Sequence, residues 1–163
     1  MSATRRDVLL GGAAAVLVPA SAAAATGDAA LLENLLAHER KLESAYHLAL
    51  RRDLLDAATA RTLRDQERAH IRGLEQTLRR MGRPRPRRAA PIEAQIPEHR
   101  YFARYALELE SRTVAAYLDA LERLRNTRLL LPLGSIAANQ GQHVVILRDA
   151  LGLPPLEASL AVS

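Results

Sequence analysis

Two segments of the chain carry the same helical pattern, and this repeat restricts the fold more than any other feature. The segment LLAHERKLESAYHLAL, residues 35–50, aligns with ALELESRTVAAYLDAL, residues 106–121. The alignment pairs Glu39 with Glu110 and Tyr46 with Tyr117, each by a shift of 71 positions. Apolar residues recur at helical spacing in both segments, so the repeat predicts two amphipathic helices of one design.

A second helical pattern follows the first in each half of the chain. The segment LRDQERAHIRGL, residues 63–74, corresponds to IAANQGQHVVIL, residues 136–147. The polar residues pair as Glu67 with Gln140 and His70 with His143, each by a shift of 73 positions. The first copy is therefore an intact Glu-x-x-His motif, and the second has glutamine in place of the glutamate. Two helical hairpins of similar pattern are predicted.

The helical patterns have recognisable ends. We expect helices over about 29–52, 57–81 and 98–125, and a fourth that begins near Arg128 or at Pro132 and ends at Ala150 or Leu151. Asp28 and Asp56 are candidate N-caps, because an aspartate side chain accepts hydrogen bonds from the first backbone N–H groups. Short loops make the helices of each hairpin antiparallel neighbours. The link over 82–97 reaches the length of a bundle at ~3.3 Å per residue. The fold class is all-α, a four-helix bundle of two hairpins joined by a long crossover.

Composition excludes several kinds of site. The 163 residues include no cysteine, so disulfides, thiolate metal sites and catalytic thiols are absent. The formal charge is +5, and six arginines lie within residues 79–88. No aromatic residue interleaves with these arginines to stack on bases. We interpret them as a solvated surface, and we expect no nucleic-acid partner.

The first 25 residues are typical of an export signal. Arg5 and Arg6 precede an uncharged run over 8–18, and small residues with Ala-x-Ala cleavage options follow. The segment TRRDVLL resembles the twin-arginine signal: Ser or Thr, two arginines, any residue and two apolar residues. This resemblance implies that the twin-arginine machinery exports residues 26–163 already folded, to the periplasm. An ordinary secretory signal is the alternative, and an uncleaved signal would be the only membrane contact.

Polar residues lie near the middle of all four apolar faces. They are Glu39, Glu67 with His70, Glu110, and Gln140 with His143. Three carboxylates in one core repel one another and resist the loss of water, and divalent cations would compensate them. Glu-x-x-His places both side chains on one helix face, so both can reach one metal. Carboxylates and imidazoles suit iron or manganese. The alternative is a hydrogen-bonded polar layer without metal, and Tyr46 and Tyr117 would donate into either arrangement.

With this set of residues, the chain over about 29–151 resembles the ferritin-like superfamily, specifically the exported bacterial ferritin-like domain proteins. In that superfamily, a di-iron or di-manganese centre takes one glutamate from one helix of each hairpin and a Glu-x-x-His from the other. The resemblance implies as metal ligands Glu39, Glu67, His70, Glu110 and His143. It also implies one or two ions of iron or manganese and an oxidoreductase acting on Fe(II), O2 or peroxide.

Gln140 departs from the family pattern. Glutamine cannot supply a bridging anion, so we expect Gln140 to be a weak ligand or a hydrogen-bonding neighbour. We also expect the metal position built from Gln140 and His143 to be the weaker one. The alternative function is a non-catalytic structural or interaction protein of the cell envelope, with a degenerate, metal-free site.

Other polar residues have less specific interpretations. Glu43 lies four residues from both Glu39 and His47 on one helix. It either supplies a further oxygen ligand or forms a partly exposed pair with His47. We expect His38 and His99 at the surface.

Overall fold

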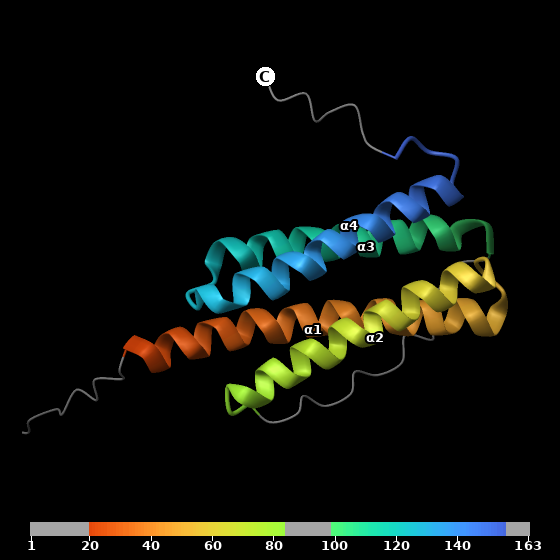
Figure 1. Ribbon diagram of the computed structural model, residues 1–163. Coiled ribbons are helices and arrows are strands. Elements are labelled where there is room, and N and C mark those ends of the chain that lie inside the picture. The colour runs from red at the N-terminus through yellow and green to blue at the C-terminus, as the bar shows by residue number, and fades with distance from the viewer. Residues whose placement is uncertain (1–19, 84–98, 156–163) are drawn as a thin grey trace, which may run out of the picture.

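Four long helices lie side by side in the computed structural model, which describes residues 20–83 and 99–155 (Figure 1). They are α1 (Ala20–Arg52), α2 (Ala57–Arg80), α3 (His99–Arg123) and α4 (Leu130–Ala150), with a 3-10 turn, η1 (Thr127–Leu129), before α4. Helix α1 packs on α2, α3 packs on α4, and the two hairpins meet between α1 and α3. Helix α3 begins at the end of the bundle where α1 and α2 are joined, and α2 ends at the other (Figure 1). The predicted four-helix bundle of two hairpins is confirmed; residues 84–98 of the predicted crossover lie outside the described residues.

Helix ends follow local sequence signals at most boundaries. The Asp56 side chain accepts a hydrogen bond from Thr59 N at 2.8 Å and caps α2, as predicted. Gly82, with φ of 73°, follows the last turn of α2, and Gly152, with φ of 66°, follows α4. Helix α4 begins at Leu130, between the two predicted starts. Pro132 lies in its first turn, where a missing N–H leaves no hydrogen bond unmade.

The prediction that Asp28 caps the first helix is wrong. Helix α1 begins at Ala20, because the alanine-rich segment before Asp28 favours helix over termination. Asp28 is instead buried inside the helix. Its carboxylate accepts hydrogen bonds from Arg125 N at 3.0 Å and Asn126 N at 2.9 Å, directly after α3. Asp28 thereby ties α1 to the connection between α3 and α4.

The core consists of two apolar clusters with a polar layer between them. One cluster includes Leu42, Leu63, Phe102 and Leu147, and the other includes Leu35, Leu74, Ala120 and Leu133. Along every helix, the inward-facing polar residues lie between the members of these two clusters. The polar layer is therefore closed by apolar packing above and below. No helix in the described ranges is both long and apolar enough to cross a bilayer.

Replacing Asp28 with alanine should destabilise the fold. Two backbone N–H groups would lose their acceptor, at a cost of about 1–3 kcal/mol each when they stay buried. Urea unfolding of the Asp28→Ala variant measures this loss. Asp119→Ala is the matched control, because Asp119 is exposed and pairs with Arg123 on the same helix, and such a pair contributes about 0.5 kcal/mol. Equal stability of the two variants would contradict the role given to Asp28.

Candidate metal centre

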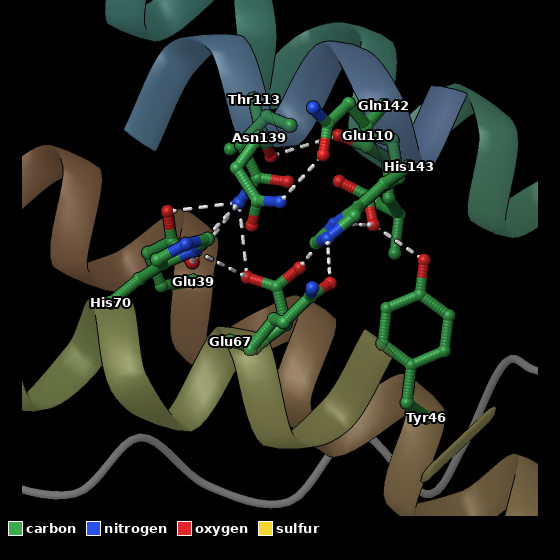
Figure 2. A network of polar contacts seen from close by, with 12 residues as sticks. Glu39, Tyr46, Glu67, His70, Glu110, Thr113, Asn139, Gln142 and His143 are labelled. Carbon is green, nitrogen blue, oxygen red and sulfur yellow. Dashed lines mark hydrogen bonds and ion pairs between the residues drawn. The ribbon is translucent and has the colours of Figure 1, made fainter. Parts of the chain in front are cut away.

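Six polar side chains from four helices converge in the layer between the apolar clusters. They are Glu39 on α1, Glu67 and His70 on α2, Glu110 on α3, and Gln140 and His143 on α4. Five are fully buried, and the His70 side chain is 11% exposed. Figure 2 shows Glu67 between two sides of the layer, with His70 and Glu39 on one side and His143 and Glu110 on the other. The structure thus brings together every metal ligand predicted from the sequence.

The donor atoms form two groups that share one carboxylate. Glu39, Glu67 and His70 each offer an atom within 4.8 Å of the others, and Glu67, Glu110 and His143 do the same. We call these the His70 group and the His143 group. Glu67 belongs to both groups and is the carboxylate that they share. This arrangement of carboxylates and histidines is compatible with metal binding.

Two buried tyrosines donate hydrogen bonds to the outer carboxylates. Tyr46 Oη, on α1, lies 2.5 Å from Glu110 Oε1 on α3, and Tyr117 Oη, on α3, lies 2.6 Å from Glu39 Oε1 on α1. The residues paired by the sequence repeat therefore make matching contacts in opposite directions: the tyrosine of α1 donates to the glutamate of α3, and the tyrosine of α3 donates to the glutamate of α1. Burial and the nearby carboxylates raise the pKa of both tyrosines well above its usual value, so both stay protonated donors.

Both histidines of the layer direct Nδ1 toward carboxylates. His143 Nδ1 lies 2.9 Å from Glu67 Oε1 and 3.2 Å from Glu110 Oε1. His70 Nδ1 lies 3.3 Å from Glu39 Oε2 and 3.4 Å from Glu67 Oε2. Burial alone would lower the pKa of each ring, but hydrogen bonds and the negative charge of the carboxylates outweigh it and raise each pKa to about 9. Without metal, both rings are imidazolium cations at neutral pH.

The three carboxylates differ in their preference for the proton. Burial raises the pKa of Glu39 to about 7, and it raises the pKa of Glu110 as well. Burial also acts on Glu67, but hydrogen bonds with Glu39, His143 and His70 outweigh it and lower the pKa of Glu67. In the absence of metal, the positive charges of the two histidines therefore balance the negative charge of the ionised Glu67 and its neighbours, and a proton on Glu39 reduces the remaining negative charge of the layer.

Three oxygens of this buried layer lack a hydrogen-bond partner among the described residues. They are Glu67 Oε1, Glu110 Oε2 and Gln140 Oε1. Glu67 Oε1 does form an ion pair with His143 Nδ1, at 2.9 Å. Buried polar atoms are normally satisfied, and an incomplete buried network is costly. The side chains of the layer therefore leave three buried oxygens that could accept a hydrogen bond or bind a cation.

Gln66 takes part in the site although it was not predicted from the sequence. Its Oε1 lies 2.6 Å from His143 Nε2 and accepts the proton of that nitrogen. This contact leaves the Nδ1 atom of the ring facing Glu67 and Glu110. The repeat carries a signal for this role, because Asn139 stands at the matching position, directly before Gln140. Asn139 instead donates to Gln142 Oε1 at 3.2 Å, so the two halves differ here.

The two sides of the layer also differ in their distance from solvent. A surface hollow of about 450 Å³ borders the layer and is lined by His70, Ser135, Ile136, Ala138, Asn139 and Gln142. His143 is fully buried. Small solutes therefore come closest to the site on the side of His70.

The less specific sequence predictions have mixed outcomes. Glu43 pairs with Arg68 on α2 at 2.9 Å, and it belongs to neither donor group. Neither the extra ligand nor the pair with His47 is observed for it among the described residues. His38 is half-buried instead of lying fully at the surface, and its pKa is lowered by burial and then by Lys41. The His99 side chain lies outside the described residues.

Comparison with known proteins supports the geometry. The family model of a ferritin-like domain matches residues 27–153, which contain the whole polar layer. No curated protein and no solved structure shows a significant match to the chain.

The metal-free protein should lose thermal stability as the pH rises. Each imidazole has a pKa of about 9 in the folded chain and 6.5 unfolded, so its stabilising contribution is complete below pH 6.5 and is lost as the pH passes 9. The raised pKa of Glu39, about 7 against 4.5 unfolded, acts in the same direction at lower pH. The melting temperature after chelation should therefore fall from pH 6.5 to 9.

The control for this measurement is a histidine outside the layer. His70→Gln removes one titrating ring and should reduce the fall in melting temperature, whereas His47→Gln, at an exposed position, should leave it unchanged. A melting temperature that is constant or rises over this pH range would show that the layer is not held by protonated histidines.

Proposed function

Because the chain belongs to the ferritin-like domain family, we propose that it binds divalent iron or manganese in the core of its bundle. The supporting observation is the polar layer: three carboxylates and two imidazoles converge, and three buried oxygens of this layer have no hydrogen-bond partner within residues 20–83 and 99–155. A donor set of oxygen and imidazole nitrogen, without thiolate, suits these ions.

The side chains around the donors prepare them for a cation. Tyr46 engages Oε1 of Glu110 and leaves Oε2 unpartnered. Gln66 holds His143 through Nε2, so that Nδ1 is the atom presented. Both imidazoles must lose a proton before they can act as ligands. Metal affinity should therefore increase with pH, while the stability of the metal-free protein decreases.

Redox activity is the further step that the family resemblance implies. Bound Fe(II) would supply one reducing electron per ion, and the reduction of hydrogen peroxide to two water molecules consumes two electrons and two protons. The polar layer would hold the ions, and small oxidants would approach from the surface hollow beside His70.

One observation favours the alternative function, a metal-free structural protein of the cell envelope. The protonated histidines already balance much of the carboxylate charge, because their pKa values lie at about 9. The unpartnered oxygens favour metal instead. Metal analysis of the folded protein separates the two functions.

Wild-type protein, purified folded and titrated anaerobically with Fe(II) or Mn(II), should bind at least one ion per chain. Glu67→Gln should abolish binding, because it removes the charge of the carboxylate shared by both donor groups. Elemental analysis after desalting and calorimetry measure the bound metal. Glu108→Gln, at an exposed position of α3, is the control and should bind like wild type. Substoichiometric metal that is identical in all three proteins would refute metal binding.

Export is a second part of the proposal. The segment TRRDVLL and the weakly apolar run after it support transport of the folded chain to the periplasm by the twin-arginine machinery. The family match begins at residue 27, so the proposed signal, residues 1–25, lies outside the matched domain. A folded substrate suits a protein whose metal site forms only when four helices meet.

Replacing Arg5 and Arg6 by lysine should retain the full chain in the cytoplasm. The twin-arginine machinery reads the arginine pair, whereas an ordinary secretory signal needs only positive charge. Cell fractionation and the size of the chain report export and cleavage. Lysines at Arg79 and Arg80, another adjacent pair on the exposed face of α2, serve as the control. Unchanged export of the Arg5→Lys, Arg6→Lys variant would identify an ordinary secretory signal.

A further inference from the structure

The amide group of Gln140 occupies the centre of the His70 group. Its Nε2 donates to Glu39 Oε1 at 3.0 Å, to Glu39 Oε2 at 3.1 Å and to Glu67 Oε2 at 3.0 Å. The same nitrogen lies 3.4 Å from His70 Nδ1. The nitrogen of the amide, not its oxygen, faces the ionised Glu67, which only accepts hydrogen bonds. A partly positive N–H2 group thus contacts all three side chains that would otherwise hold a cation.

The His143 group has no comparable occupant. Glu67 Oε1 and Glu110 Oε2 lack hydrogen-bond partners among the described residues. His143 Nδ1 contacts both carboxylates, at 2.9 and 3.2 Å. The His70 group therefore has a hydrogen-bond donor in contact with all of its side chains, although Gln140 Oε1 is itself unpartnered among the described residues, whereas two carboxylate oxygens of the His143 group lack such a donor. The difference is not one of access, because the His70 group is the one that borders the surface hollow.

We propose that the chain holds one divalent ion, at Glu67, Glu110 and His143, and that Gln140 keeps the His70 group closed to a second ion. The inference rests on the proposed metal binding, and it specifies where the metal binds and how many ions the chain holds. It differs from the expectation that the position near Gln140 and His143 is the weaker one. The long side chain of Gln140 extends away from its own helix neighbour His143 and reaches the carboxylates of α1 and α2.

Charge and hydrogen bonding both act on the second position. With neutral imidazoles, three carboxylates and one divalent cation carry a net charge of −1, and a second cation would make it +1, which only a further carboxylate would neutralise. Opening the second position would also break the Gln140 hydrogen bonds to two carboxylates and leave a buried N–H2 group without acceptors. A glutamate at position 140 would remove the N–H2 group and add the fourth negative charge. Gln140 therefore occupies the second position with its N–H2 group and also withholds the negative charge that a second ion would need.

The test counts ions and asks whether they are neighbours. Metal-free full-length protein is titrated anaerobically with Mn(II), and bound ions are counted by calorimetry and by elemental analysis after desalting. Electron paramagnetic resonance distinguishes an isolated Mn(II) ion from a magnetically coupled pair. Wild type should bind one ion with the spectrum of an isolated centre. Gln140→Glu should bind two ions with the spectrum of a coupled pair.

The matched control is Gln142→Glu. Gln142 is exposed on the same helix, so this variant adds the same charge without reaching the layer and should still bind one ion. Two ions in wild type, or one ion in a folded Gln140→Glu variant, would overturn the role of Gln140. No ion in any of the three proteins would refute the proposed metal binding itself, so the two failures are distinguishable.

A second pair of variants locates the ion even if Gln140→Glu does not fold. Glu110 and Glu39 are related by the repeat, and each accepts a hydrogen bond from a tyrosine. Glu110→Gln should weaken binding of the single ion roughly tenfold or more, and it should weaken binding more than Glu39→Gln does. The opposite order would place the ion in the His70 group and overturn the inference.

Discussion

The burial of three carboxylates in one layer is the constraint on which the rest of the structure depends. Glu39, Glu67 and Glu110 are fully buried, on three different helices. A buried carboxylate needs a proton, a cation or several hydrogen-bond donors. All three forms of compensation occur here: a proton on Glu39, whose pKa is raised to about 7, the protonated histidines as cations, and the tyrosine hydroxyls and the Gln140 amide as donors. The helices must keep their register to deliver these donors, so the polar layer fixes the alignment that apolar packing alone would leave adjustable.

Much of the fold was predictable from the sequence because it follows from periodicity. Apolar residues at helical spacing mark the four helices, and the repeat marks the hairpins, so the inward direction of Glu39, Glu67, His70, Glu110 and His143 was predicted correctly. The errors concern contacts between segments distant in sequence. Asp28 has the local sequence pattern of an N-cap, but its carboxylate oxygens accept hydrogen bonds from backbone N–H groups about 97 residues away. Spacing along one helix does not reveal such a partner.

The two halves of the site are alike in sequence but not in chemistry. The crossed tyrosine contacts preserve the symmetry of the repeat. Gln66 and Asn139 occupy matching positions, yet Gln66 contacts His143 while Asn139 contacts Gln142. Gln140 changes the site most, because its amide crosses to the other half of the layer. The substitution was visible in the sequence, whereas the direction of the side chain was not, since a glutamine has three rotatable bonds that only its surroundings fix.

The number of ions limits what the site can do. A single Fe(II) ion gives up one electron, but reduction of hydrogen peroxide to water consumes two. A chain that holds one ion would therefore complete this reaction only if a second electron came from another donor. Two neighbouring ions would need no such donor, and Gln140 stands at the position where the second ion would bind. Under the proposed role of Gln140, the residue at this position determines whether the layer holds one ion or two neighbouring ions.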